Sequence, residues 1–356
     1  MRMAEPGGIM ETKSVAEAIA WQANHAEENG APGTARLIRS LNVLLDTDTA
    51  TGRRMANWHG LSLEDALPLR LAGGFHWLFL SGEEPRLGEV YSGLMTDQSL
   101  VDGLVAETAQ TFDHVLLPWL DRPPQTNEAA RSATVMAALM WLSGKLGPTF
   151  ELNEIGASAG VNTMTARFAF DLGGVRIGPS LSSLKIVPEW RGAPPPDNPV
   201  DIVGAQGCDT MPVDLTDPAA ALRLKAYIWP DATERMARMD AAIAMAEKMP
   251  PELVQQDALE FVKERLQAEQ EDGVTRVLFH TIMWQYLPEI TRDAITEAME
   301  EAGAAATPEK PLAWIAVETN RETFKHECRV RYWPGGEDAV MLGEAHAHGA
   351  WVDWKG

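Results

Sequence analysis

Helical spacing dominates the first 145 residues of this chain. Apolar side chains recur there every three or four positions, so that Leu37, Leu41 and Leu44, for example, share one helical face. Helices are predicted near residues 15–23, 37–45, 68–80, 100–120 and 125–145. No alternating pattern typical of a strand precedes Phe150. We therefore expect residues 1–147 to form an all-α domain or cap.

Short strand and helix patterns alternate from Phe150 onward. Strands are predicted at residues 151–155, 202–207, 253–255, 276–280 and 312–317, and helices at residues 161–168, 218–227, 232–248, 258–267 and 288–302. A hairpin follows at residues 328–342, and a last strand at residues 350–354. Such alternation is typical of a parallel sheet covered by helices. Residues 148–356 are therefore expected to form a Rossmann-like α/β domain with a mostly parallel sheet and a C-terminal antiparallel hairpin.

A glycine-bracketed turn follows the first predicted strand and reads Glu154-Ile-Gly156-Ala-Ser158-Ala-Gly160. Parallel α/β sheets bind small molecules at such turns, because backbone N–H groups and the start of the next helix are free there to meet a polar ligand. The turn is therefore the first place to expect a functional site.

The same turn resembles the first motif of S-adenosylmethionine-dependent methyltransferases, an E/D-x-G-x-G-x-G frame in which Ser158 replaces the middle glycine. The five strand–helix steps closed by a hairpin also follow the chain order of a methyltransferase-type sheet. The resemblance implies that Glu154, Gly156, Ala157, Ser158 and Gly160 bind this cofactor. Small residues let the backbone approach it, and the acidic side chain organises the turn or accepts from the cofactor's ammonium through water.

Acidic residues follow the next two predicted strands. The methyltransferase resemblance implies that Asp209, after the second strand, accepts from the ribose hydroxyls, and that Asp257 and Ala258, after the third, contact the adenine. Asp171 competes with Asp209 for the ribose role, because Asp209 is separated from Gly156 by a long insertion. Asp209 could equally be a turn or helix-cap residue.

The fourth predicted strand ends in a histidine and is followed by aromatic residues. His280 is a candidate general base at neutral pH, and Trp284 is a candidate wall of the substrate pocket. A single histidine at a strand end is more often only a hydrogen-bonding group.

Four polar residues precede the long apolar helix before the first strand. Glu128 is a second candidate base, and Gln125, Asn127 and Arg131 are expected to line the same pocket as Gly156 if the helix starts at the carboxyl edge of the sheet. The alternative is helix capping together with a Glu128–Arg131 ion pair one helical turn apart.

Two other functions fit the same residues. The turn also satisfies G-x-S-x-G, which would make Ser158 the nucleophile of a serine hydrolase, with Asp257 as the acid and His346 or His348 as the base. That fold needs several strands before the serine, and the sequence upstream is helical. The other alternative is a non-catalytic sensor of a nucleotide ligand that keeps the sheet without the chemistry. His346 and His348 lack a third ligand, and no metal is expected.

Composition narrows the class of partner. The chain has 356 residues and a formal net charge of −21, which repels nucleic-acid phosphates. Two cysteines give no disulfide framework, no apolar run is long enough for a membrane span, and residues 1–20 lack the pattern of an export signal. We expect a cytoplasmic protein that binds a small-molecule substrate and neither nucleic acid nor membrane; the sequence leaves the oligomeric state open.

Several blocks of the sequence, taken together, are similar to those of a bacterial domain-of-unknown-function family, number 2332. The resemblance runs from about Ser14 to Trp354 and implies a Rossmann-like fold more directly than any reaction. The blocks are QTNEAARSA, ELNEIGASAGVN, GCDTMPVDLTDPAAALRLKAYIWPDATERMARMDAAI and VLFHTIMWQYL.

Overall fold

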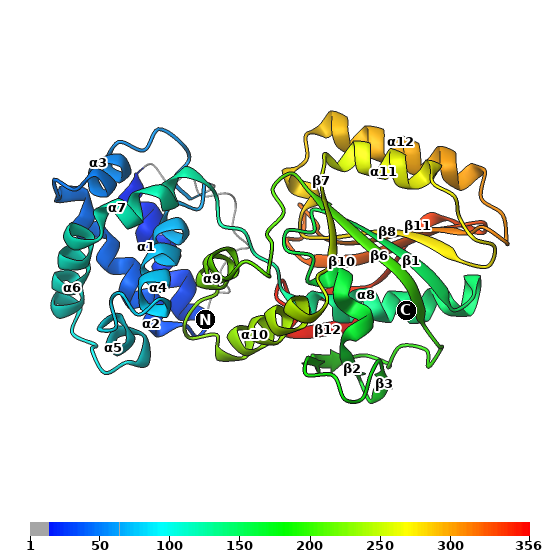
Figure 1. Cartoon of the computed structure of the whole chain (residues 1–356), viewed down its shortest axis with the longest axis horizontal. Coiled ribbons are helices and arrows are strands. Elements are labelled where there is room, and N and C mark those ends of the chain that lie inside the picture. The colour runs from blue at the N-terminus through cyan, green and yellow to red at the C-terminus, as the bar shows by residue number, and fades with distance from the viewer. Residues whose placement is uncertain (1–13, 64) are drawn as a thin grey trace, which may run out of the picture. The chain divides into compact units, whose positions relative to one another are not determined.

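The computed structural model describes residues 14–63 and 65–356 (Figure 1). Residues 1–13, part of the segment in which no export signal is expected, lie outside the described residues. Among the helices that are described, none combines the length and the apolar character needed to cross a membrane.

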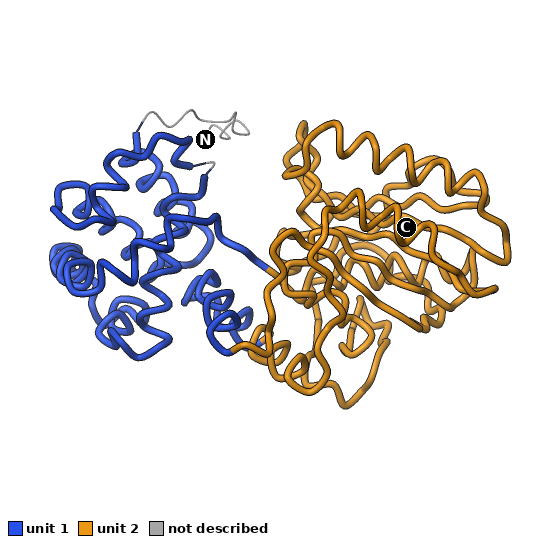
Figure 2. The backbone as a smooth tube through the Cα atoms, turned by 45° about the horizontal axis from the view of Figure 1, so that its top comes forward, with its two compact units in different colours: residues 1–126, 218–237 blue, residues 127–217, 238–356 orange. Residues whose placement is uncertain are grey.

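Contacts divide the chain into two compact units, each made of two pieces (Figure 2). The first unit contains residues 1–126 and 218–237, and the second contains residues 127–217 and 238–356. The helix predicted at residues 125–145 therefore belongs with the sheet, whereas the segment at 218–237, which follows the second predicted strand, belongs with the N-terminal helices.

The first unit contains helices and no strand among its described residues, as the apolar spacing predicts. Its core is formed by fully buried side chains such as Leu41, Leu71 and Phe75. The helix predicted at 100–120 is interrupted, because Phe112 leaves helical geometry after α6. Asp113, the next residue, accepts from the N–H groups of Ala50 and Thr51 at the start of α3. The helices are α1 (Val15–Glu28), α2 (Pro32–Ser40), η1 (Leu41–Asp46), α3 (Ala50–Ala56), α4 (Leu67–Leu80), α5 (Leu87–Ser92), α6 (Gln98–Thr111), α7 (Asp113–Leu116), η2 (Leu117–Asp121) and α9 (Pro218–Ala226).

One carboxylate ties the segment at 218–237 to the N-terminal helices. Asp231 accepts from the backbone N–H groups of Gly33 and Thr34 at 2.9 Å each and from the Thr34 hydroxyl at 2.6 Å. These N–H groups belong to the first turn of α2, whose N-terminal donors have no partner within the helix. Asp231 therefore caps α2 from a position 198 residues away from Gly33 in the chain.

Replacing Asp231 with Ala is expected to lower the free energy of unfolding of this unit by roughly 1–2 kcal/mol, because two helix N–H groups lose their acceptor. Hydrogen exchange should speed up in peptides covering α2 and residues 218–232. Asp214, which caps only the local turn at Thr216, provides the control. Equal effects of Asp231→Ala and Asp214→Ala would show that the cap does not hold the segment.

A nine-stranded sheet forms the centre of the second unit. Its order is β5-β12-β11-β10-β9-β8-β1-β6-β7. The strands are β1 (Thr149–Ile155), β5 (Glu189–Arg191), β6 (Asp201–Asp209), β7 (Glu252–Gln255), β8 (Thr275–Thr281), β9 (Leu312–Thr319), β10 (His326–Trp333), β11 (Gly336–Ala345) and β12 (Trp351–Trp354). The five predicted strands and the C-terminal hairpin are confirmed, and β9, β8, β1, β6 and β7 are all parallel.

The order of these parallel strands defines where a ligand is expected. In chain order they lie third, second, first, fourth and fifth across the sheet, as in doubly wound α/β folds. The direction of winding reverses between β1 and β8, and ligands of such sheets bind at the carboxyl ends of the strands at that reversal. The glycine turn follows β1, and His280 lies near the end of β8.

Helices cover both faces of the sheet (Figure 1). On one face α8 (Ser132–Leu146) packs against β9 and β10. On the other face α11 (Ala258–Gln267) and α12 (Glu289–Ala304) pack against each other and against the strands. Helix α10 spans Thr233–Lys248, of which residues 233–237 belong to the first unit, and η5 is a short 3₁₀ helix at Trp284–Tyr286.

Two predicted helices of the second unit differ from the structure. The segment after the turn forms only a 3₁₀ helix, η4 (Asn162–Arg167), because β-branched threonines disfavour a longer helix and the Thr163 hydroxyl donates to the backbone oxygen of Gly160. The helix predicted from residue 125 begins with η3 (Ala129–Arg131) and continues as α8. The insertion before β6 holds a small sheet of β2 (Ala169–Leu172), β3 (Val175–Ile177) and β4 (Lys185–Ile186), which the sequence analysis missed.

Candidate functional site

The turn after β1 requires glycine at both ends. Gly156, Ser158 and Gly160 all have positive φ, of 66°, 53° and 69°. A Cβ atom on Gly156 would lie 2.8 Å from the side chain of Met283, and one on Gly160 would lie 2.9 Å from Pro251. Ser158 adopts a left-handed conformation that costs a side-chain-bearing residue about 1–2 kcal/mol. The turn is therefore tightly packed and locally strained.

The backbone N–H groups of the turn are not free, contrary to the expectation from sequence. Asp209 accepts from the N–H of Ser158 at 2.9 Å. Asn127 accepts from the N–H groups of Ala159 at 3.2 Å and Val161 at 2.9 Å. The N–H groups of Ala157 and Gly160 bind backbone oxygens. Any ligand of this turn must therefore be recognised mainly by side chains.

Three buried polar atoms around the turn have no hydrogen-bond partner among the described residues. They are Oε2 of Glu154, Oγ of Ser158 and Oδ1 of Asn162. Glu154 is 1% exposed, and its other oxygen accepts only a long bond from Asn162 at 3.5 Å. Burial raises the pKa of Glu154 well above its ordinary value, although Asn162 and the charge of Arg131 act in the opposite direction. Leaving buried polar atoms unpaired is costly, so this cluster calls for an explanation.

Asp209 and Asp257 both follow parallel strands, but each carboxylate already has a local role. Asp209 accepts from Ser158 and from the N–H of Met211, and it thereby fixes the turn. Asp257 caps α11 by accepting from Leu259 and Glu260, and Ala258 is buried in the first turn of that helix. Asp171, the competing ribose candidate, lies in the small sheet, where it accepts from Gly174.

Ser158 satisfies one requirement of a hydrolase nucleophile and lacks another. Its positive φ matches a strained strand-to-helix elbow. Its Oγ, however, makes no hydrogen bond to a histidine or to any other described residue. Asp257 is committed to its helix cap. The required chain from serine to histidine to acid is therefore not assembled.

The polar residues before α8 lie in an irregular segment and in η3. Asn127 holds the turn, as described above, and Glu128 forms a buried ion pair with Arg238 at 2.9 Å. Arg131 donates to the backbone oxygen of Ala347 at 2.8 Å, and its charge reaches Glu154 and His326. Gln125 belongs to the first unit. The structure thus brings Asn127 and Arg131 to the carboxyl edge of the sheet and gives Glu128 an ionic partner.

His280 is held at both ring nitrogens. Its Nδ1 lies 2.7 Å from Oε1 of Glu318, and its Nε2 accepts from the indole N–H of Trp314 at 3.0 Å. Because an indole N–H can only donate, the ring carries its proton on Nδ1 and is uncharged in this arrangement. Trp284 stacks on the ring at 4.8 Å. Both nitrogens are occupied, so His280 orients Glu318 and has no nitrogen left to act as a base.

The loop after β8 connects the glycine turn to Glu318. The side chain of Met283 packs on Gly156, and its N–H donates to Oε1 of Glu318 at 3.0 Å. Ile282, just before it, has a φ of 53°, which is a strained conformation for a β-branched residue. Sequence reasoning missed Glu318; the signal was the polar run Glu318-Thr-Asn320 after the buried strand β9.

The two C-terminal histidines lie against each other after β11. The rings of His346 and His348 are 5.7 Å apart in an edge-to-face arrangement. No group of three His, Cys, Asp or Glu side chains in the described part of the chain is placed to hold a metal ion.

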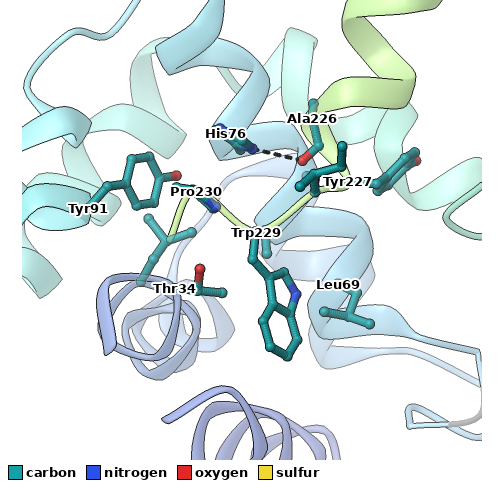
Figure 3. A pocket seen from close by; sticks show the side chains of 12 residues that line it. Thr34, Leu69, His76, Tyr91, Ala226, Tyr227, Trp229 and Pro230 are labelled. Atoms are coloured by element: carbon teal, nitrogen blue, oxygen red, sulfur yellow. Dashed lines mark hydrogen bonds between the residues drawn. The ribbon is translucent and has the colours of Figure 1, made fainter. Parts of the chain in front are cut away.

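A cavity lies within the first unit between α4, α2 and the segment after α9 (Figure 3). His76, Tyr91, Tyr227 and Trp229 line it, and its volume of about 10 Å³ is about that of one water molecule. His76 is buried and bonds through Nδ1 to the backbone oxygen of Ala226. This cavity is too small for an organic ligand.

The fold and the edge geometry together define an α/β protein with a candidate small-molecule site where β1, β8 and β9 end. The chain belongs to the family described as an uncharacterised protein conserved in bacteria (DUF2332), whose model matches residues 16–354. No curated protein and no solved structure matches it.

Proposed function

We propose that this protein is an S-adenosylmethionine-dependent methyltransferase that acts on a small molecule and binds the cofactor at the Gly156–Gly160 turn. The observation that carries the proposal is the group of unpaired, buried polar atoms of Glu154, Ser158 and Asn162 beside a glycine turn at the reversal of strand order. A polar ligand with both donors and acceptors would pair them.

The residues present fit the amino-acid end of this cofactor. Glu154 would accept from its ammonium, and the charge of Arg131, which already reaches Glu154, would favour its carboxylate. Asp209 keeps unused lone pairs for the ribose while it holds Ser158. The cofactor supplies a methyl group activated by its sulfonium, so the protein has to align the acceptor and exclude water. Met283 would have to move from Gly156 to admit the ligand.

Titration calorimetry with S-adenosylmethionine and S-adenosylhomocysteine tests this proposal. We expect binding with a dissociation constant in the micromolar range for at least one of them. If neither ligand at millimolar concentration gives more heat than its own dilution, the cofactor site is ruled out.

Ser158→Gly separates the methyltransferase from the hydrolase. Glycine adopts positive φ without cost, so the variant should be more stable by about 1 kcal/mol. It should keep cofactor binding through Glu154 and Asn162, with a loss of no more than about tenfold for the missing Ser158 hydroxyl. A hydrolase would lose its nucleophile and all labelling by a fluorophosphonate probe. Labelling of the wild type at Ser158, lost in Ser158→Gly, would replace our proposal with the hydrolase.

A further inference from the structure

A second feature of the same edge is a cavity of about 380 Å³ where β9 and β10 meet. Its volume lies within the range of about 300–1,000 Å³ found for small-ligand sites. Glu318 and Glu327 line it, and the strand register places them directly opposite each other on the two strands. Two like charges in such a position destabilise a sheet unless each has a counter-charge.

Among the residues that the structure describes, only one of the two carboxylates has an arginine or lysine within ion-pair distance. Glu327 pairs with Arg329 at 2.7 Å and accepts from the side-chain amide of Asn320 at 2.9 Å. Glu318 accepts from the uncharged ring of His280 and the N–H of Met283, and both bonds end on Oε1. Its side chain is 15% exposed and lines the cavity, and its other oxygen, Oε2, accepts no hydrogen bond from the described residues.

Glu318 is held in a fixed orientation by neighbours that do not neutralise its charge. His280 cannot supply the missing charge while Trp314 occupies its Nε2 as a donor. Arg321, a further cation on the cavity lining, is exposed to solvent. A carboxylate oriented by two donors, facing a cavity and lacking a counter-charge is suited to a cationic ligand that donates hydrogen bonds.

We propose that this cavity binds the protonated amine of a small molecule, with Oε2 of Glu318 as the acceptor and His280 and Met283 as positioning groups. The inference stands apart from the proposed cofactor, because it uses a different carboxylate on a different strand. Within the proposed function, this ammonium would anchor the acceptor substrate by its charge, while another, uncharged group of the same molecule receives the methyl.

Saturation-transfer NMR with three simple probes, and no cofactor, tests the inference. Propylamine, propanol and propionate share one chain length and differ in charge. We expect saturation transfer to propylamine with millimolar affinity and none to the other two. Glu318→Gln should weaken propylamine binding at least about fivefold, since its amide still accepts from His280 and Met283 but carries no charge.

Glu322→Gln is the matched control, because Glu322 lies on the same lining, is exposed and loses the same charge. It should leave binding within about twofold of the wild type. Equal losses in the two variants would reduce the effect to the protein's overall negative charge and overturn the proposal. Equal binding of propionate would show that the cavity does not select a positive charge, and it would overturn the proposal as well. Ala316→Leu provides a second arm, because it narrows the cavity without changing charge and should also abolish propylamine binding. Unchanged binding in that variant would equally overturn it.

Discussion

Glu154→Gln is expected to make the protein more stable and to abolish cofactor binding. The Glu154 carboxyl is buried, and burial raises its pKa well above the ordinary value of 4.5. The folded state therefore holds a proton that the unfolded state releases as the pH rises above 4.5, so wild-type stability falls through the window between 4.5 and the raised pKa. Glutamine keeps the shape and stays neutral. The variant should gain about 1–3 kcal/mol in free energy of unfolding at pH 8 and nothing at pH 4.

The raised pKa of Glu154 also predicts that the protein releases a proton when the cofactor binds. If Glu154 accepts from the ammonium of S-adenosylmethionine, it must ionise as the ligand binds, and a proton is released below its raised pKa. Calorimetry in two buffers of different ionisation enthalpy measures this release. A wild type that binds with no proton release would remove Glu154 from the cofactor site, whatever its effect on stability.

Glu151→Gln is the control on the same strand. Glu151 points to the opposite face, where it pairs with Arg276 at 3.1 Å and with Arg265. Its loss leaves the buried Arg276 without its charge partner and should destabilise the protein by roughly 3 kcal/mol. The two glutamates should thus respond in opposite directions to the same substitution. A loss of stability in both variants at pH 8 would contradict the account given for Glu154.

His76 is expected to make the first unit acid-sensitive. Burial lowers the pKa of His76 from 6.5 to about 4, against smaller opposing effects of the backbone oxygens of Ala226 and Ile228. The unfolded state takes up a proton below pH 6.5 and the folded state does not until about pH 4. Stability is therefore fully present above pH 6.5 and falls by roughly 3 kcal/mol as the pH drops to 4.

His76→Phe removes this dependence, since phenylalanine fills the aromatic cluster with Phe79 and Tyr91 but does not titrate. The variant should lose about 1 kcal/mol at pH 7, because the Ala226 oxygen loses its donor, and should show a flatter profile below pH 6.5. Urea unfolding between pH 4 and 7, followed by hydrogen exchange in α4, measures both effects. His114→Phe, at an exposed histidine, should keep the wild-type profile. If the stability of His76→Phe falls with pH below 6.5 as steeply as that of the wild type, His76 is not the cause of the acid sensitivity.

Local sequence signals determined most of the second unit. The predicted α11 matches its observed bounds, Ala258–Gln267, because Asp257 is a capping residue whose partners lie two and three positions away. The five parallel strands were predicted because buried strands form short apolar runs separated by polar helices. The position of the glycine turn was also predicted from local sequence, because Gly156 and Gly160 closely follow a short predicted strand and glycine ends a strand whatever element comes after it.

The chemistry of the edge was decided by tertiary structure. The acceptors that occupy the turn's N–H groups come from Asn127 and Asp209, 32 and 51 positions away from their partners. Glu318 meets His280 across 38 positions, and Asp231 caps a helix 198 positions earlier. Periodicity reports which face of an element is apolar, and it carries no information about which distant polar groups meet. For this chain, sequence alone determined the order of the elements and the location of the turn, whereas the pairing of buried polar groups, and with it the role of each candidate residue, depended on the folded structure.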